Sequence, residues 1–139
     1  MTTDASKRGR GSRNKGANGE RELAKILREQ YGIEAQRGKV FYHESDLIGI
    51  PGIHPEVKRV ERLNIHEAVK QAIDEAEKRK DGKPVVFHRR NRGGWLVTLR
   101  LEDFMNIYQE ATRTPQNGQE NPQADKHPQE PKEGHHGAI

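Results

Sequence analysis

Three observations predict an α/β domain with a mixed, five-stranded central sheet flanked by helices. Apolar spacings of three and four residues, typical of helices, alternate along the chain with short apolar runs that suit strands. The resulting order is one helix, three strands, a second helix, two strands and a closing helix. Nearly all Leu, Ile, Val and aromatic side chains lie between residues 20 and 111. One domain over residues 15–112 is therefore expected, between a disordered basic arm (1–14) and a disordered polar tail (113–139).

The composition of the 139-residue chain excludes several classes of protein. Cysteine is absent, so disulfides, thiolate metal sites and cysteine nucleophiles are not available. No apolar run is long enough to cross a bilayer, and the N-terminus lacks the apolar segment of a signal peptide. With 30% hydrophobic residues and a mean hydropathy of −1.12, we expect an intracellular, cytoplasmic protein with no membrane partner.

Positive charge is concentrated near the N-terminus. The formal net charge is +4, and residues 1–15 hold five Lys and Arg side chains against Asp4 alone. A flexible basic arm binds a phosphate backbone because binding releases condensed counterions. A solubilising tail explains the same charges equally well, so both interpretations stay open.

A first helix is predicted from Gly16 to Gly32, where glycine ends it. Glu20 precedes Leu23 by three residues and Leu27 by seven, so it shares their inward face. A carboxylate buried there needs a neutralising partner. The alternative interpretation places Glu20 in the first helical turn, where it complements the helix dipole.

The remaining elements follow from alternation, turn residues and helical periodicity. Pro51-Gly52 suits the centre of a type II turn between two strands, and Asn64 suits the cap of a second helix. Pro55 cannot donate to a sheet ladder, so it is expected at the start of its strand or along an unpaired edge. The predicted strands are 33–37, 40–50, 53–60, 84–88 and 94–99, and the later helices are 65–80 and 101–108.

Two of these strands carry side chains suited to phosphodiester chemistry. Asp46 lies on one of them. Glu56 and Lys58 lie two residues apart on the other, so the side chains of Glu56 and Lys58 point to the same face. Carboxylate and backbone oxygens hold Mg²⁺ while leaving positions open to water and phosphate. Asp46, Glu56 and the carbonyl of Val57 are candidate ligands, with Glu20 as an outer ligand through water. Lys58 is a candidate for orienting the water or stabilising charge on the phosphate.

The same residues resemble a known family. The motifs that carry the resemblance are Lys15-Gly-Ala-Asn-Gly-Glu20, Ser45-Asp46-Leu, Glu56-Val-Lys58, and Pro84-Val-Val-Phe before Gly94-Trp95. Over residues 13–110 the chain is similar to the archaeal-type Holliday junction resolvases of the PD-(D/E)xK nuclease superfamily. It is still more similar to the resolvases of phages and prophages. Ser45 stands where the superfamily motif has proline, and Pro55 stands where a branched apolar residue is expected.

The resemblance implies a restriction-endonuclease-like core and an enzyme that needs no small-molecule cofactor. It implies a homodimer that cuts strands symmetrically across a four-way junction of double-stranded DNA, using Mg²⁺ with Mn²⁺ as a possible substitute. The implied site residues are Glu20, Asp46, Glu56 and Lys58 for the metal centre, and Arg21 and Arg37 for DNA contact.

Further polar residues are candidates for DNA contact. The basic hairpin tip suits phosphates, whereas Trp95 is interpreted as a core residue. His43 and His54 are interpreted as surface or edge residues, because no metal-binding His motif accompanies them. Gln71 suits a contact to water or phosphate and equally a solvated helix flank. The additional candidates are Arg59, Arg62, Gln71, Arg89, Arg90 and Arg92.

Three kinds of function are compatible with these features. The leading hypothesis is a Mg²⁺-dependent endonuclease selective for branched DNA, because the nuclease core uses nearly all foldable residues and leaves no domain for reading base sequence. A nicking or repair endonuclease is the alternative among nucleases. A non-catalytic DNA-binding module, or a protein that recognises RNA or sugar, is the alternative from other classes.

Overall fold

The computed structural model describes residues 4–39, 42 and 44–113, with side chains from residue 16 onward. The elements follow the predicted order and confirm a mixed α/β chain. Internal contacts divide the chain into two compact units, residues 1–104 and 105–139, and the sites described below belong to the first. The elements are α1 (Asp4–Tyr31), β1 (Gln36–Arg37), β2 (Leu47–Ile48), β3 (Ile53–Arg59), α2 (Ile65–Arg79), β4 (Lys83–Arg89), β5 (Leu96–Thr98) and α3 (Leu101–Thr112).

The described strands form two sheets, which corrects the prediction of one five-stranded sheet. β1 pairs with β2 in antiparallel fashion, while β3 pairs with β4 in parallel and β4 with β5 in antiparallel fashion. Asp46 explains the division, because its Oδ2 accepts the Val57 N–H at 2.8 Å. In a continuous sheet a backbone carbonyl of the neighbouring strand would accept that N–H. A side chain thus replaces a ladder hydrogen bond between β2 and β3.

β2 is shorter than the predicted strand over residues 40–50, of which residues 40, 41 and 43 lie outside the described part of the chain. Gly49 follows β2 with a φ of +88°, a conformation that glycine adopts readily. A Cβ at Gly49 would lie 2.1 Å from the carbonyl oxygen of Glu34. The strand therefore ends at Ile48, where the chain turns against the segment before β1.

Pro55 lies on the edge of β3 that faces away from β4. Backbone groups along a strand point alternately to its two sides. Lys83 N donates to Gly52 O and Val60 N donates to Arg89 O, so the even-numbered residues of this segment bond to β4. The missing N–H of Pro55 consequently falls on the opposite side, as the unpaired-edge prediction requires.

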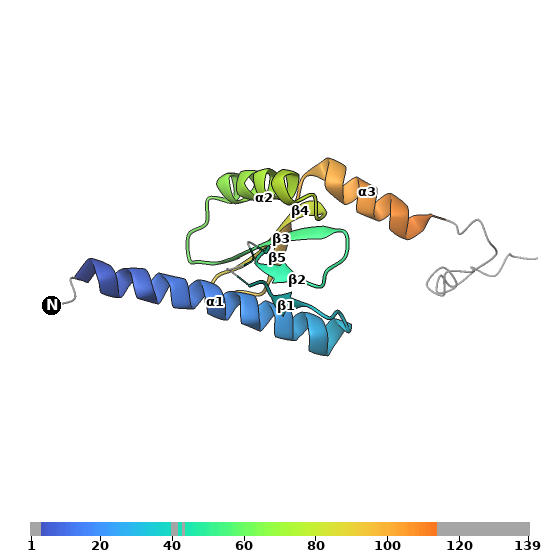
Figure 1. Ribbon diagram of the computed structural model, residues 1–139. Helices are drawn as coiled ribbons and strands as arrows, with labels where there is room; N and C mark the ends of the chain where they lie inside the picture. The colour runs from blue at the N-terminus through green and yellow to red at the C-terminus, as the bar shows by residue number, and fades with distance from the viewer. Residues whose placement is uncertain (1–3, 40–41, 43, 114–139) are drawn as a thin grey trace, which may run out of the picture. The chain divides into compact units, whose positions relative to one another are not determined.

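α1 and α2 cover opposite faces of the three-stranded sheet (Figure 1). The core on the α1 side contains Val57. The core on the α2 side contains Val86, which pairs in register with Glu56. Since neighbouring residues of a strand alternate between its faces, Glu56 and Lys58 share the α2 face. The buried residues of the two hydrophobic clusters are Leu23, Ala24, Ala35, Leu47 and Val57 on the first side, and Ala68, Ala72 and Val86 on the second.

Local turn and cap predictions are confirmed. Gly32 has a φ of +66° immediately after α1. Ile53 N donates to Ile50 O at 3.2 Å and Gly52 has a φ of +79°, as a type II turn requires. Asn64 Oδ1 accepts the Glu67 N–H at 3.2 Å and so caps α2.

The first helix differs from its prediction at the N-terminal end. α1 begins at Asp4, so residues 4–15, expected to lie mostly in a disordered arm, belong to the helix. They include no proline, and Ala5 and the five Lys and Arg residues favour helix without apolar periodicity, whereas Gly9 and Gly11 disfavour it. The predicted polar tail lies outside the described residues beyond Arg113. None of the described helices has both the length and the apolar character needed to cross a bilayer.

Candidate active site

A polar cleft of about 250 Å³ contains three of the predicted site residues, Asp46, Glu56 and Gln71. Asp46 immediately precedes β2, Glu56 lies on β3 and Gln71 on α2, so three separate elements contribute to one space. Every side chain that lines the cleft is polar or charged, which suits a charged ligand. The other lining residues are Glu44, Ser45, His54, Glu75 and Arg79.

Asp46 is fixed in the cleft by the Val57 N–H, which occupies its Oδ2 and leaves Oδ1 available. Burial raises the pKa of the Asp46 carboxyl above its ordinary value, although the hydrogen bond from Val57 and the positive charges of Lys58 and Arg79 act in the opposite direction. The negative charge of Asp46 is thus held in the cleft at some cost in free energy.

Glu56 and Lys58 form the second part of the site. Glu56 is 5% exposed, and Lys58 Nζ lies 3.1 Å from its Oε1. Burial raises the pKa of the Glu56 carboxyl, and the negative charge of Asp46 raises it further. Two buried carboxylates that repel each other would be stabilised by a cation between them.

Glu20 reaches the site region from α1 but does not line the cleft. Its Oε2 accepts a hydrogen bond from Arg37 Nε at 2.6 Å. Burial raises the pKa of Glu20 despite this partner, and the charge of Asp46 contributes to the increase. The first-turn interpretation is wrong, because α1 begins at Asp4 and Glu20 therefore lies in the helix interior.

The donor set fits Mg²⁺ with a partly hydrated coordination shell. Within the described residues, no group of three or more His, Asp or Glu side chains converges to hold a metal ion. Mg²⁺ commonly binds through one or two carboxylates and keeps several waters, which Asp46 and Glu56 can provide. The N–H and C=O of a strand residue point to the same side, so the Val57 carbonyl also faces the Asp46 side.

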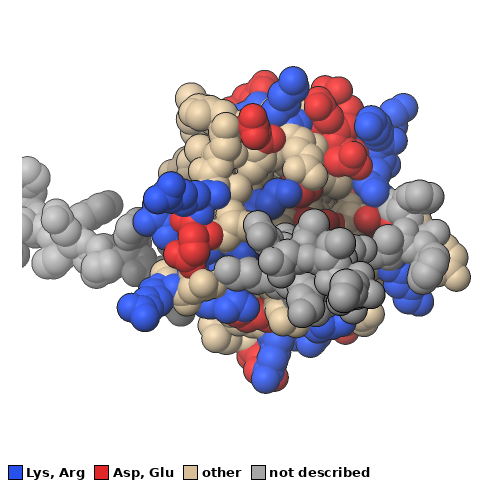
Figure 2. Space-filling model, turned by 90° about the vertical axis from the view of Figure 1, so that its left-hand side faces the viewer, with Lys and Arg blue, Asp and Glu red and all other residues tan. Residues whose placement is uncertain are grey.

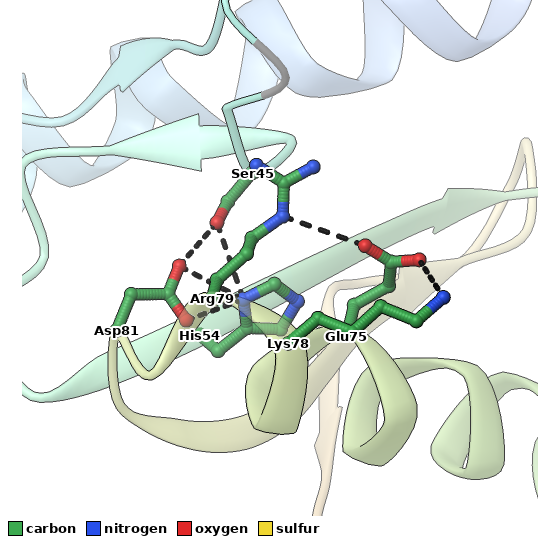
Figure 3. Close-up of polar contacts among 6 residues, drawn as sticks. All are labelled: Ser45, His54, Glu75, Lys78, Arg79 and Asp81. Carbon is green, nitrogen blue, oxygen red and sulfur yellow. Dashed lines mark hydrogen bonds and ion pairs between the residues drawn. The ribbon is translucent and has the colours of Figure 1, made fainter.

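A hydrogen-bond network that the sequence pattern did not reveal joins Ser45, His54 and Asp81 (Figure 3), and the first two of these line the cleft. Ser45 Oγ donates to Asp81 Oδ2 at 2.5 Å. His54 Nδ1 lies 2.8 Å from Asp81 Oδ1 and 3.2 Å from Ser45 Oγ. Because a carboxylate only accepts, Nδ1 carries a proton. Burial alone would raise the pKa of Asp81, but the hydrogen bonds from Ser45 and His54 hold it below the ordinary value.

His54 lines the cleft from the edge strand β3, and its burial corrects its interpretation as a surface residue. The residue is 1% exposed, and its Nε2 is buried without a hydrogen-bond partner among the described residues. The period of a strand places His54 on the same face as Glu56, and this spacing was the available signal. His43 lies outside the described residues.

Arg79 and Glu75 form an ion pair at the α2 side of the cleft (Figure 3). Arg79 Nε lies 3.4 Å from Glu75 Oε2, and Lys78 Nζ lies 3.9 Å from Glu75 Oε1. Basic residues in the last turn of a helix commonly complement the helix dipole. Arg79 instead lines the cleft, and its positive charge acts on Asp46.

Glu22 of α1 ties two of the predicted DNA-binding arginines to the body of the domain. Arg59 Nη1 lies 3.3 Å from Glu22 Oε2, and Arg89 Nη1 lies 3.0 Å from Glu22 Oε1. Trp95 Nε1 donates to the same Oε1 at 3.1 Å, and its ring packs against the core on the α1 side. The positive charges of Arg59 and Arg89 are therefore partly neutralised within the protein.

The other predicted DNA-binding residues are more open to solvent. Arg21 is exposed and donates to Asn18 Oδ1 at 3.4 Å, while Arg37 is bound to Glu20. Arg62, Arg90 and Arg92 are exposed and form no ion pair with a described residue. These three are the arginines best placed to meet a phosphate.

No protein-family model matches the chain, and a comparison with curated proteins finds no significant match.

Proposed function

We propose that this protein is a Mg²⁺-dependent endonuclease selective for branched double-stranded DNA, most simply a Holliday junction resolvase that acts as a homodimer. One observation carries the proposal: Asp46 and Glu56, from different elements, line a single polar cleft, with Lys58 3.1 Å from Glu56. Carboxylates and a lysine in this arrangement suit phosphodiester hydrolysis. The motifs shared with the PD-(D/E)xK resolvases support the same reaction.

Five residues in or beside the cleft have a role in this reaction. Mg²⁺ bound by Asp46 and Glu56 would act as a Lewis acid on the phosphate and make a bound water more acidic. Lys58 Nζ would contact a phosphate oxygen as negative charge develops there. The amide of Gln71, exposed at the cleft, would donate a hydrogen bond to a second phosphate oxygen. Glu20 does not line the cleft, so it would bind the metal only through water.

A four-way junction assay tests this function. Purified protein is incubated with a labelled junction or a linear duplex of matching sequence, with Mg²⁺ or with chelator. We expect paired, symmetric cuts in the junction only, lost in chelator and in Asp46→Asn. Lys58→Ala should slow cutting about 100-fold, the effect of removing one group that stabilises transition-state charge. Asp74→Asn is the matched control, because Asp74 is an exposed α2 residue outside the cleft.

The outcomes separate the competing functions. Equal cutting of the linear duplex would exclude a junction resolvase and favour a less selective nuclease. Nicks on one strand only would favour a nicking or repair endonuclease. Junction binding without cutting under any metal condition would favour a DNA-binding module.

A further inference from the structure

A second groove, of about 430 Å³, lies where β3 and β4 end. The segment between β3 and α2 forms one side, and the hairpin between β4 and β5 forms the other. Figure 2 faces this left-hand end of Figure 1 and shows tan surface between blue and red side chains. We call this space the hairpin groove and define it by Val60, Leu63, Ile65, Trp95, Leu96 and the rim residues Glu61, Arg89 and Arg90.

The groove offers a planar aromatic surface that is already ordered. Trp95 is held through its Nε1, which donates to Glu22 at 3.1 Å. The guanidinium of Arg89 lies 5.9 Å from the centre of the indole ring and is itself bound to Glu22. A fixed indole loses little conformational entropy when another flat ring packs beside it. The apolar side chains around it, including the 61% exposed Leu96, favour a ligand with an apolar face.

The rim of the groove carries groups of both charges. Arg90 is exposed and forms no ion pair with a described residue, so it is available to an anion. Glu61 Oε1 accepts the Asn91 N–H at 2.8 Å, which orients the carboxylate and leaves Oε2 available to a donor. Arg92 lines an adjoining groove together with Arg90. An apolar ring that bears an amino group and is linked to a phosphate complements all of these features.

We propose that the hairpin groove binds an unpaired base of the DNA strand whose phosphate lies at Asp46 and Glu56. This inference rests on the proposed function and refines its substrate to DNA with unpaired bases next to the cut. The base packs against Trp95 and Leu96, and its phosphate contacts Arg90. Glu61 accepts a hydrogen bond from an exocyclic amino group, as carboxylates do from cytosine N4. Thymine, which has no amino group, binds less tightly.

The position of the groove along β3 connects it to the carboxylates. Lys58 is paired in register with His88, and His88 lines the groove. Val60 follows Glu56 by four residues, which corresponds to about 13 Å along an extended chain. One DNA strand can therefore reach from the cleft to the groove, which opens where β3 and β4 end.

Intrinsic fluorescence provides a direct test, because Trp95 is the single tryptophan of the chain. The full chain is titrated in chelator with a short deoxycytidine oligonucleotide, the thymidine equivalent, and the same backbone without bases. We expect fluorescence quenching by the cytosine strand, weaker binding of thymine, and about ten-fold weaker binding of the abasic strand, within the range for base stacking on an aromatic side chain.

A pair of neighbouring variants controls for charge and folding. Leu96→Glu places a carboxylate in the groove and should weaken cytosine binding about ten-fold, comparable to the loss of base stacking. Val97→Glu adds the same charge to the same strand at a 53% exposed position that does not line the groove, and it should bind like the wild type. Leu96→Gln replaces Leu96→Glu if circular dichroism shows that the latter does not fold.

Three results would overturn the inference: no binding of the cytosine strand, equal affinity for abasic and cytosine strands, or equal losses in Leu96→Glu and Val97→Glu. Because chelator prevents cleavage, this test is independent of the nuclease assay. Mg²⁺-dependent junction cutting with equal abasic affinity would refute the groove alone. Base-dependent binding by a protein that cuts no DNA would support the groove and refute the nuclease.

Discussion

Replacing Asp81 with alanine tests whether the network in Figure 3 stabilises the fold. The variant removes the acceptor of His54 Nδ1, which is almost completely buried. A buried donor left without a partner costs about 1–3 kcal/mol. Ser45 Oγ remains 3.2 Å from Nδ1, and the Asp81 side chain is 34% exposed, so water can enter. We therefore expect a loss of about 1.5 kcal/mol, the lower half of the range.

Thermal unfolding followed by circular dichroism measures this loss. For a domain of roughly 100 residues, each kcal/mol lowers Tm by about 4–8 °C, so Asp81→Ala should lower it by about 6–12 °C. Asp81→Asn keeps one acceptor oxygen and should lose less. Asp74→Ala, an exposed position on α2, should stay within about 0.5 kcal/mol of the wild type. If Asp81→Ala behaved like Asp74→Ala, the network would contribute nothing to stability and our reasoning would be refuted.

Three further predictions concern the metal, protons and the α2 cap. Mg²⁺ at ten times its Kd should raise the free energy of unfolding by about 1.4 kcal/mol. Thermal scans should show this increase in the control variant Asp74→Asn and its loss in Glu56→Gln. An equal increase in both variants would exclude Mg²⁺ binding at Glu56. In the folded chain, burial raises the pKa values of Glu20, Asp46 and Glu56. The folded state therefore binds protons at these carboxylates more tightly than the unfolded state does. In chelator, the free energy of unfolding should increase as the pH falls from neutral through the raised pKa values. The urea midpoint of the wild type should increase as the pH falls, and that of Glu56→Gln should increase less. A wild-type midpoint that decreases as the pH falls would contradict this prediction. Asn64→Ala should lower the free energy of unfolding by about 1 kcal/mol, because it removes the helix cap. Urea unfolding should show that Asn64→Asp keeps most of this stability. Equal losses in both variants would contradict the role of the side-chain oxygen.

Local signals explain which parts of the fold were predictable. The type II turn at Pro51-Gly52 and the cap at Asn64 depend on residues within three or four positions of each other, and both are confirmed. The strand period also placed Glu56 and Lys58 on one face before their 3.1 Å contact was known. The shared cleft of Asp46 and Glu56 followed from the expectation that their two strands lie side by side.

Contacts between distant residues explain what the sequence could not reveal. Ser45 and Asp81 are 36 residues apart, and Glu22 and Trp95 are 73 apart. By local sequence alone, Asp81 suits a turn and Glu22 an exposed helix position, which are the usual roles of isolated carboxylates. The single five-stranded sheet was wrong for a related reason. Only the three-dimensional arrangement shows that the Asp46 carboxylate, rather than a backbone carbonyl, accepts the Val57 N–H.

The edge of β3 that faces away from β4 pairs with no described strand, and this has a consequence for how inactive variants are chosen. An open strand edge is a template for pairing with another chain. Pro55 offers no N–H along this edge, and the Asp46 carboxylate covers the N–H of Val57. The proposed metal ligand therefore also protects the domain against intermolecular strand addition. Asp46→Ala would uncover the Val57 N–H and favour aggregation, whereas Asp46→Asn keeps an oxygen there and is the better variant for trapping uncut DNA.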